Sequence, residues 1–355
     1  MTKNICILAG ARPNFIKVSP LVRAISQRPE ATCLLVYAGS AGDPTLEPSL
    51  FDDLQIDRPQ YYLGVVSTSL NEITSQVMAQ FDHFLDEHTV DVVIVVDDLA
   101  STMAAAIVTK KRGIRLAHLV AGTRSFNINM PKEINRLVID ALSDYLFTAG
   151  VRSTGVATRE QSEQSQTFMV GNILMDTLRF NHDRLKKSAS LPDLTEGEYI
   201  VFTLNRKALL ADQENLQKML QSMSEAAGDV PIIAPLRAES AKVVSSLNAR
   251  LTIIDSLSYL EFCWLTAHAK GVVTDSGNVA EEATFNGVPC ITLNDYTEHQ
   301  ETVTIGSNVL VGEDPERLRE AVAKMVGGSW KHSALPDRWD GRTADRILQI
   351  LLSND

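Results

Sequence analysis

The run Val90-Asp91-Val92-Val93-Ile94-Val95-Val96 decides the fold, because every residue in it except Asp91 is a valine or an isoleucine. A strand that is apolar on both faces is typical of the interior of a parallel sheet with helices on each side. The polar pair Asp97-Asp98 follows at once and ends the run. We therefore predict a central strand of a doubly wound α/β domain, with a polar loop at its carboxyl end.

Outward from this run, short apolar segments alternate with longer amphipathic ones. The expected strands of the first half of the chain are Ile5–Leu8, Cys33–Tyr37, Arg115–Leu119, Tyr145–Thr148 and Thr167–Val170. The expected helices are Pro13–Ser26, Leu70–Glu87, Ser101–Lys111 and Pro131–Leu142. Strands that alternate with helices indicate βαβ units, and such units build parallel sheets.

The same alternation restarts after the polar stretch Lys186–Glu198. The expected strands of this second series are Tyr199–Thr203, Pro231–Pro235, Thr252–Ile254, Gly271–Val273 and Pro289–Leu293. The expected helices are Asp212–Ala227, Ser240–Asn248, Tyr259–His268 and Val279–Phe285. Two series imply two doubly wound, Rossmann-like α/β domains, which we place at residues 1–172 and 173–338. Residues 339–355 would hold a last helix, Thr343–Leu352, that packs back on the first domain.

Composition narrows the class of protein. The chain has 355 residues, a net charge of −11 and 45% hydrophobic residues, so a large core is expected and a nucleic-acid surface is disfavoured. The four cysteines are scattered without zinc or disulfide spacing, which indicates reduced core residues. Neither a signal peptide nor an apolar stretch of membrane-spanning length is evident. We expect a soluble cytoplasmic protein.

Ligands of doubly wound sheets bind beyond the carboxyl ends of the strands, so the loops there should carry the function. The first such loop is Gly10-Ala11-Arg12-Pro13-Asn14-Phe15-Ile16-Lys17. Pro13 suits the first turn of a helix, and cations near that end are unfavourable against the helix dipole. Arg12 and Lys17 therefore either hold an anion between them and the backbone, or lie on a solvated basic face.

Two further loops leave alternatives open. The carboxylates of Asp97 and Asp98 could supply a helix cap together with a catalytic acid or base, or a cap alone. Farther on, Arg124 and Arg136 could meet a phosphate, or could pair structurally with Glu133 and Asp140.

The run Val273-Thr274-Asp275-Ser276-Gly277-Asn278-Val279-Ala280-Glu281-Glu282 joins a strand to a helix through a small polar turn. Unpaired N–H groups at such a turn suit a diphosphate. Glu282, about one turn into the helix, is an acceptor suited to ribose hydroxyls. The run thus indicates a nucleotide-sugar site, or else an ordinary connection in which Ser276 is the N-cap.

Six motifs in order carry a resemblance to a known family. They are Gly-x-Arg-Pro-x-x-x-Lys at 10–17, the Asp98 loop, x-Ala-Gly-x-Arg at 120–124, Pro-x-Glu-x-Asn-Arg at 131–136, Gly171-Asn172-x-x-x-Asp176, and Thr274-Asp275-Ser276-Gly277 with Glu281-Glu282. Together they resemble the UDP-N-acetylglucosamine 2-epimerase family across nearly the whole chain. The resemblance implies a glycosyltransferase-B type fold, a UDP-sugar in the cleft between two Rossmann-like domains, a homodimer, and no cofactor or metal.

The resemblance also assigns roles by position. Phe262 would stack on uracil, Ser276 and Gly277 would hold the diphosphate, and Glu282 would hold the ribose. The remaining candidates for binding the phosphates, the sugar or an anionic acceptor are Arg12, Lys17, Arg124, Arg136, Asn205, Arg206 and Arg237.

The family reaction removes the proton at sugar C2, expels UDP to give a 2-acetamidoglucal, and adds UDP back; a hydrolysing branch adds water instead. Carboxylates of the family supply much of the proton transfer. This chain keeps Asp98 but has Val120 and Lys132 where the family has glutamates. Asn205 and, less directly, Arg237 stand where the family has histidines. Residues 38–43 replace a Gln/His-rich regulatory loop of some bacterial members, so that regulation is expected to be absent.

The candidate catalytic residues are Asp98, Lys132 and Glu133. Lys132 could act as a base if burial lowered its pKa, and Glu133 could move into the place of a missing carboxylate. Three functions remain open: 2-epimerase-like chemistry in cell-surface polysaccharide or nucleotide-sugar metabolism, sugar transfer from a nucleotide sugar to an acceptor, and non-catalytic binding of a UDP-sugar.

Overall fold

The computed structural model describes residues 2–247 and 249–353. Met1, Asn248 at the end of an expected helix, and residues 354–355 lie outside the described residues. Contacts divide the chain into two compact units, the first comprising residues up to Phe180 and those from Asp337 on, and the second Asn181–Pro336.

In the described part of the first unit, seven parallel strands form one sheet in the order β3-β2-β1-β4-β5-β6-β7. The strands are β1 (Lys3–Ala9), β2 (Ala31–Tyr37), β3 (Tyr61–Tyr62), β4 (Val92–Val96), β5 (Arg115–Leu119), β6 (Tyr145–Thr148) and β7 (Gln166–Met169). All of β4 is buried, as its apolar sequence predicts.

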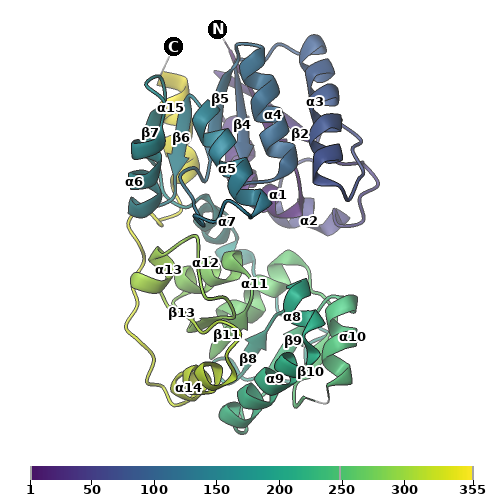
Figure 1. Cartoon of the computed structure of the whole chain (residues 1–355), viewed down its shortest axis with the longest axis vertical. Helices are drawn as coiled ribbons and strands as arrows, with labels where there is room; N and C mark the ends of the chain where they lie inside the picture. Colours follow the sequence, from purple (N-terminus) through teal and green to yellow (C-terminus); the bar gives the residue numbers. More distant parts are fainter. Residues whose placement is uncertain (1, 248, 354–355) are drawn as a thin grey trace. The chain divides into compact units, whose positions relative to one another are not determined.

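Helices cover both faces of this sheet (Figure 1). On one face α3 (Leu70–Glu87), α4 (Ala100–Lys111) and α5 (Pro131–Leu142) lie side by side, and on the other α1 (Arg12–Ser26) packs against α15 (Thr343–Ser353). Alternate residues of the central strands, such as Cys6 and Val93, join the core beneath α3 and α4. The remaining helices of the unit are α2 (Pro48–Leu54), α6 (Val151–Glu160) and α7 (Ile173–Asn181).

Residues 173–180 belong by contact to the first unit, whereas the sequence places the boundary after residue 172. The reason is a set of polar contacts that bind α7 to this unit. The Thr177 hydroxyl donates to the carbonyl of Ile16 at 2.6 Å. Asp176 accepts from the backbone N–H groups of Thr343 (3.0 Å) and Ala344 (2.8 Å) at the start of α15.

The second unit repeats the same topology, with a parallel sheet in the order β10-β9-β8-β11-β12-β13 in its described residues. Its strands are β8 (Ile200–Phe202), β9 (Ile232–Pro235), β10 (Thr252–Ile254), β11 (Gly271–Thr274), β12 (Cys290–Thr292) and β13 (Asn308–Leu310). Its helices are α8 (Lys207–Ala211), α9 (Gln213–Ala227), α10 (Ala238–Ser246), α11 (Tyr259–Ala267), α12 (Gly277–Asn286), α13 (Glu301–Thr304) and α14 (Pro315–Val326), and a 3₁₀ turn His182–Arg184 precedes β8.

Period-two alternation fills both faces of the second sheet. Ile200 and Phe202 pack with α9 and α14, while Tyr199 and Val201 pack with α11 and α12. The expectation of two Rossmann-like, doubly wound α/β domains is confirmed.

Both strand orders reverse direction beside the first strand of the unit, between β1 and β4 and between β8 and β11. Loops diverge at such a switch point and leave room for ligands beyond the carboxyl ends of the strands. Among the described residues no helix is long and apolar enough to cross a membrane.

We predict a pH-dependent contribution of Asp176 to stability. Burial raises the pKa of this carboxyl to about 6 in spite of its two N–H donors, whereas an unfolded aspartate titrates near ~3.9. The folded state therefore favours the protonated form, so the contribution is fully present below about pH 3.9 and is lost as the pH rises through about 6.

Between pH 5 and pH 7 the wild-type protein should lose about 1 kcal/mol of unfolding free energy relative to Asp176→Asn. Urea denaturation at several pH values measures this difference. Parallel pH profiles for the two proteins would contradict the prediction.

Candidate functional site

At the switch point of the first unit, Asp97 joins the loops after β1 and β4. Its carboxylate accepts from Lys17 Nζ at 2.6 Å and from Asn14 Nδ2 at 2.9 Å. The Asn14 side chain in turn accepts from the backbone N–H of Gly10 (2.8 Å). Asp97 has φ +59°, a left-handed conformation that aspartate adopts more readily than most residues.

These contacts answer the question raised by the two cations near the start of α1. Lys17 is only 6% exposed and is paired with Asp97. Arg12 Nη2 lies 2.7 Å from Glu47 Oε1. The cations are thus balanced by carboxylates of the protein itself, and the interpretation of Lys17 as part of a solvated face is wrong.

Asp98, the next residue, points to α5. Its carboxylate accepts from Arg136 through Nε at 2.9 Å and also through Nη2, and Lys132 Nζ lies 3.5 Å away. Burial raises the pKa of Asp98, but the surrounding cations, first Lys132 and then Arg136, outweigh burial and hold this pKa below its usual range. Asp98 is therefore a buried carboxylate that stays ionised at neutral pH.

Neither aspartate caps the helix that follows them. The N-cap of α4 is Leu99, and no side chain caps that helix. The interpretation of the aspartates as helix caps is therefore wrong, because Asp97 and Asp98 are both engaged by more distant cations.

Glu133 is fixed in place by the loop before α5. It accepts from the backbone N–H and the hydroxyl of Ser125, both at 2.8 Å, from Phe126 N at 3.1 Å, and from Arg136 Nη1 at 3.2 Å. Burial raises the pKa of Glu133, and these donors reverse the shift and lower it. Ser125, Phe126 and Arg136 thus engage both carboxylate oxygens of Glu133.

Lys132 does not meet the condition set for a catalytic base. Its side chain is 58% exposed, so the burial that would favour a neutral amine is absent. Its position beside Asp98 makes it a cation at the edge of the site. Val120, in turn, has φ +71° and brings no ionisable group to the loop after β5.

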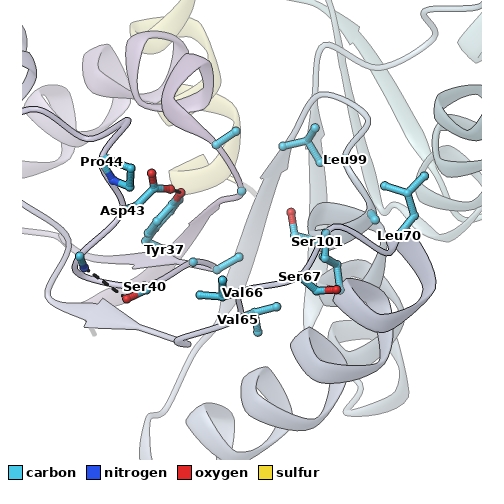
Figure 2. Close-up of a pocket in the computed structure, with 17 residues that line it drawn as sticks. Tyr37, Ser40, Asp43, Pro44, Val65, Val66, Ser67, Leu70, Leu99 and Ser101 are labelled. Carbon is cyan, nitrogen blue, oxygen red and sulfur yellow. Dashed lines mark hydrogen bonds between the residues drawn. The ribbon is translucent and has the colours of Figure 1, made fainter.

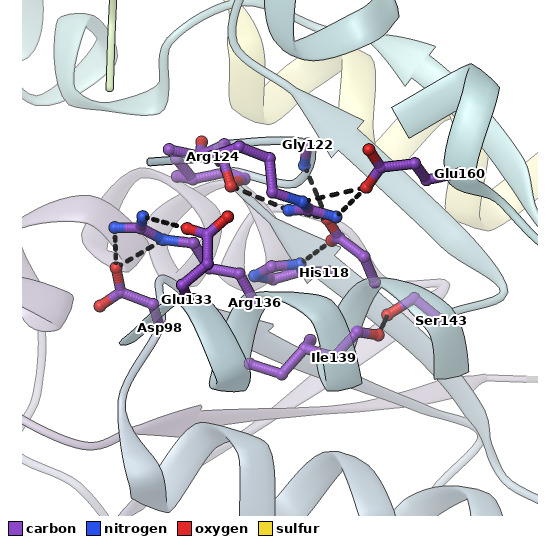
Figure 3. A network of polar contacts seen from close by, with 12 residues as sticks. Asp98, His118, Gly122, Arg124, Glu133, Arg136, Ile139, Ser143 and Glu160 are labelled. Carbon is purple, nitrogen blue, oxygen red and sulfur yellow. Dashed lines mark hydrogen bonds and ion pairs between the residues drawn. The ribbon is translucent and has the colours of Figure 1, made fainter. Parts of the chain in front are cut away.

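A second set of polar contacts lies beside the first (Figure 3). His118 Nδ1 lies 2.5 Å from Asp140 Oδ1, and its Nε2 lies 2.9 Å from the carbonyl oxygen of Asp97. Asp140 also receives Arg124 Nη1 at 2.7 Å, and Arg124 Nε donates to Glu160 at 3.0 Å. Of the two alternatives for Arg124 and Arg136, the structure shows the structural pairing, Arg124 with Asp140 and Arg136 with Glu133.

Two members of this assembly, Asn14 and His118, were not predicted from the sequence, and the role of Asp97 was not predicted. A signal existed for His118, because a histidine within an otherwise apolar buried strand needs polar partners. No sequence signal distinguished the role of Asp97 from that of Asp98, since the two are adjacent and chemically identical.

At the switch point of the second unit, Asp275 joins two loops. Its Oδ2 accepts from the backbone N–H groups of Asn205 (2.7 Å) and Arg206 (2.6 Å). Ser276 occupies the N-cap position of α12, but its side chain makes no cap bond. A Cβ added to Gly277 would meet nothing within 4 Å. The first turn of α12 thus opens on free space, as a seat for an anionic group requires.

The other predicted residues of this unit lie on neighbouring elements. Glu282 is 5% exposed and lies within α12. Phe262 is half-buried on α11, and Arg237 is exposed at the start of α10. The Arg206 guanidinium pairs with Glu313 at 2.5 Å, while Asn205 is exposed. Within the described residues no group of three or more His, Cys, Asp or Glu side chains could hold a metal ion.

Comparison with known proteins agrees with these motifs. A sequence model of the UDP-N-acetylglucosamine 2-epimerase family matches residues 23–352. The chain is 32% identical to the UDP-N-acetylglucosamine 2-epimerase of Methanocaldococcus jannaschii, over 97% of this chain and 98% of that protein. It is also 32% identical to the UDP-2,3-diacetamido-2,3-dideoxy-D-glucuronate 2-epimerase of Pseudomonas aeruginosa, over 91% and 92% of the two chains.

A solved structure of the M. jannaschii 2-epimerase, in complex with UDP-N-acetylglucosamine and UDP, superposes with a TM-score of 0.86. The two chains are 31% identical, and the match covers 99% of this chain and 100% of that one. This likeness confirms the expected fold of glycosyltransferase-B type.

The charge cluster around Arg136 predicts a large effect of removing that side chain. Arg136 is 2% exposed and lies between the carboxylates of Asp98 and Glu133. In Arg136→Met both would remain buried without their shared cation, so the unfolding free energy should fall by about 3–5 kcal/mol.

Arg112→Met is the matched control, because Arg112 also pairs with two carboxylates, those of Asp82 and Asp86, but at the surface. The loss of unfolding free energy in Arg112→Met should be much smaller than in Arg136→Met, because exposed ion pairs contribute little to stability. Urea denaturation compares the two, and equal losses would show that burial of the Arg136 cluster is energetically unimportant.

Proposed function

The chain belongs to the UDP-N-acetylglucosamine 2-epimerase family, and we propose that it binds a UDP-sugar and inverts the sugar at C2. The observation that carries this proposal is Asp98, a buried carboxylate kept ionised beside two cations at the carboxyl edge of a doubly wound sheet. An ionised carboxylate can accept the C2 proton, and the exposed ammonium group of Lys132 beside it can stabilise departing phosphate.

In this mechanism Asp98 removes the proton from C2, the C2–H electron pair forms the C1–C2 double bond, and the C1–O bond breaks with both electrons leaving on UDP. Return of a proton to the other face of C2 and attack of UDP on C1 complete the inversion. A carboxylate with a lowered pKa is a weak base. A bound diphosphate would offset the charge of Lys132, which would raise the pKa of Asp98 and strengthen it as a base.

The second unit supplies the nucleotide contacts in this proposal. N–H groups at Ser276 and Gly277 would receive the diphosphate, Glu282 the ribose hydroxyls, and Phe262 the uracil ring. The polar side chains of Asn205, Arg206 and Arg237 would act on the phosphates. The open first turn of α12 and the burial of Glu282 support these roles.

The departures from the family pattern predict slow chemistry. General acid–base groups contribute about 10²–10⁴-fold each, and Val120 and Lys132 replace two carboxylates. Because Glu133 already accepts from Ser125, Phe126 and Arg136, Asp98 carries most of the proton transfer in this proposal. The relatives described above are epimerases, so neither sugar transfer to an acceptor nor non-catalytic binding gains support from them.

We also propose that the protein works in the reducing environment of the cytoplasm and that it forms a homodimer. All four cysteines are free, as a cytoplasmic setting would keep them. The loop 125–130 and α5 expose four large apolar side chains, those of Phe126 (61%), Ile128 (60%), Ile134 (46%) and Leu137 (37%). We call these four the α5 patch. Because exposed apolar clusters mark interaction sites, the α5 patch would be buried against a second copy.

The central test is proton NMR with UDP-N-acetylglucosamine in deuterated water. Wild-type protein should exchange the C2 proton and form the manno epimer. Asp98→Asn should lower that rate at least ~100-fold and leave UDP affinity nearly unchanged. Glu282→Ala should instead weaken UDP binding about tenfold, because a buried acceptor of the ribose is lost.

Each variant is the control for the other, because one addresses chemistry and the other affinity. Exchange that survives Asp98→Asn would place the proton transfer elsewhere. UDP affinity that survives Glu282→Ala would remove Glu282 from the ribose site.

The dimer is tested by analytical ultracentrifugation of Ile134→Asp, which places a charge in the α5 patch. The wild type should sediment as a dimer and this variant as a monomer. Ile305→Asp, at a 41% exposed position of the second unit, is the control and should stay dimeric. A monomeric wild type, or a dimeric Ile134→Asp protein, would contradict the assignment.

A further inference from the structure

The second unit has a cavity of about 410 Å³ beside β13, the last strand of its sheet. Strand β13, helix α14 and residues 329–331 after that helix surround it, and we call it the β13 cavity. Its volume lies within the range of about 300–1,000 Å³ that is typical of small-molecule pockets. Among its described lining residues none has a role in the nucleotide binding or proton transfer proposed above.

The floor of the β13 cavity is apolar. Its residues are Val309, Leu310, Val311, Ala321 and Trp330. Val311 and Ala321 belong to the buried core of the unit, and Trp330 is half-buried against that core. The Trp330 indole N–H donates to Ser307 O at 2.9 Å, so the protein itself holds this ring in place. A floor of this kind suits an aliphatic or aromatic body.

Strand β13 directs part of its backbone away from the sheet. The carbonyl of Ser307 and the N–H group of Val311 make hydrogen bonds to β12, at 3.2 Å and 3.0 Å. Asn308 and Leu310 therefore face the outer edge, because residues bonded to a neighbouring strand alternate with residues that point the other way. An outer edge of this kind is the usual place where a peptide adds to a sheet as a further strand.

Side chains already occupy the outward carbonyl groups of β13. Lys331 Nζ donates to Asn308 O at 2.9 Å, and Arg317 Nη2 donates to Leu310 O at 2.8 Å. An added peptide strand would have to displace both cations in order to pair with these carbonyls. The edge is thus protected against strand addition, so the geometry favours a small molecule over a peptide as the occupant of the β13 cavity.

The β13 cavity carries an excess of positive charge. Arg317, Lys324 and Lys331 line it, whereas Glu320 is the one carboxylate among its described lining residues. Arg317 and Lys331 donate to neutral carbonyl groups, which leave their charges uncompensated. Burial lowers the pKa of Lys331, as expected for a cation without a carboxylate partner. A cavity of the first unit differs, because Asp43 is the one charged residue among its described lining residues (Figure 2).

We propose that the β13 cavity binds a small organic anion with an apolar body, such as an aryl carboxylate or an aryl phosphate. The body lies on the apolar floor, and Arg317, Lys324 and Lys331 neutralise the anionic group. An apolar floor alone would accept neutral molecules, and cations alone would attract inorganic anions. The combination selects ligands that have both features. This inference does not depend on the UDP-sugar function proposed above.

Proton–nitrogen NMR of the tryptophan indole groups tests this inference. The chain has three tryptophans, and loss of a signal in Trp330→Phe assigns the one in the β13 cavity. The probes are 2-naphthoate, 2-naphthyl phosphate and the neutral 2-naphthamide. At least one of the two anions should shift the Trp330 signal. The signals of Trp264 on α11 and of Trp339 in the first unit should stay in place.

The same titrations measure the contribution of charge. The anion that binds should do so at least about tenfold more tightly than 2-naphthamide, because hydrogen bonds to charged groups are stronger than neutral ones. Sodium chloride should weaken binding of that anion, since salt screens charges near the surface. The affinity of 2-naphthamide should change little with salt.

A charge reversal addresses the cavity itself. Lys324 is exposed in the last turn of α14, so Lys324→Glu should fold normally. It should weaken the anion at least about tenfold, because a like charge replaces an opposite one. Lys242→Glu is the matched control, because Lys242 is an exposed lysine of α10 that does not line the β13 cavity. Binding of the anion should survive in this control.

Each outcome decides the inference. A preference for 2-naphthoate or for 2-naphthyl phosphate would support it and would identify the anionic group as carboxylate or phosphate. The inference is overturned if neither anion shifts the Trp330 signal, or if 2-naphthamide binds as tightly as the anions. Unchanged affinity in Lys324→Glu would overturn it as well. Equal weakening in the two lysine variants would do the same, because it would show an effect of net charge alone.

Discussion

The ion cluster of Asp98, Arg136 and Glu133 is the interaction on which the candidate site depends. One buried guanidinium serves two buried carboxylates, one from the end of β4 and one from α5. Glu133 in turn holds the loop at Ser125 and Phe126 through three hydrogen bonds. Loss of one partner would leave an uncompensated buried charge and strongly destabilise the fold. The cluster therefore fixes the end of β4, the start of α5 and the loop between β5 and α5 relative to one another.

A second constraint is the use of aspartates to tie diverging loops at the switch points. Asp97 receives Lys17 and Asn14 from α1, while His118 of β5 holds its carbonyl oxygen. Asp275 does the same in the second unit by receiving two backbone N–H groups from the loop after β8. Both edges are therefore held in place by contacts within the protein, and pre-organised groups bind and react with less reorganisation.

Much of the fold was predictable because it follows from local patterns. The apolar run at 92–96 and the alternation of short apolar with longer amphipathic segments in each half of the chain predict two parallel sheets. Both sheets occur in the structure. The two-residue strand β3 was not predictable, since Tyr61-Tyr62 is too short to show a period. The place of α7 depends on Thr177 and Asp176, whose partners are far away in the sequence.

The candidate site was predictable in its residue types but not in their pairing. Asp98 and Arg136 are 38 positions apart and Lys17 and Asp97 are 80 apart, so no local pattern assigns these partners. For the same reason the aspartates after β4 were expected as possible caps, whereas long-range cations engage them. Lys132 illustrates the limit most clearly, because only the structure reveals that it is too exposed for the role of a base.

The cations around Asp98 hold it as a carboxylate, and titration of Asp98 itself tests this. Carbon-13 NMR of the carboxyl carbon, assigned by loss of the signal in Asp98→Asn, follows its ionisation with pH. We expect a pKa below that of an ordinary aspartate in the unliganded protein, and a rise of that pKa when UDP binds. A pKa at or above the ordinary value without ligand would show that the surrounding cations do not hold Asp98 ionised.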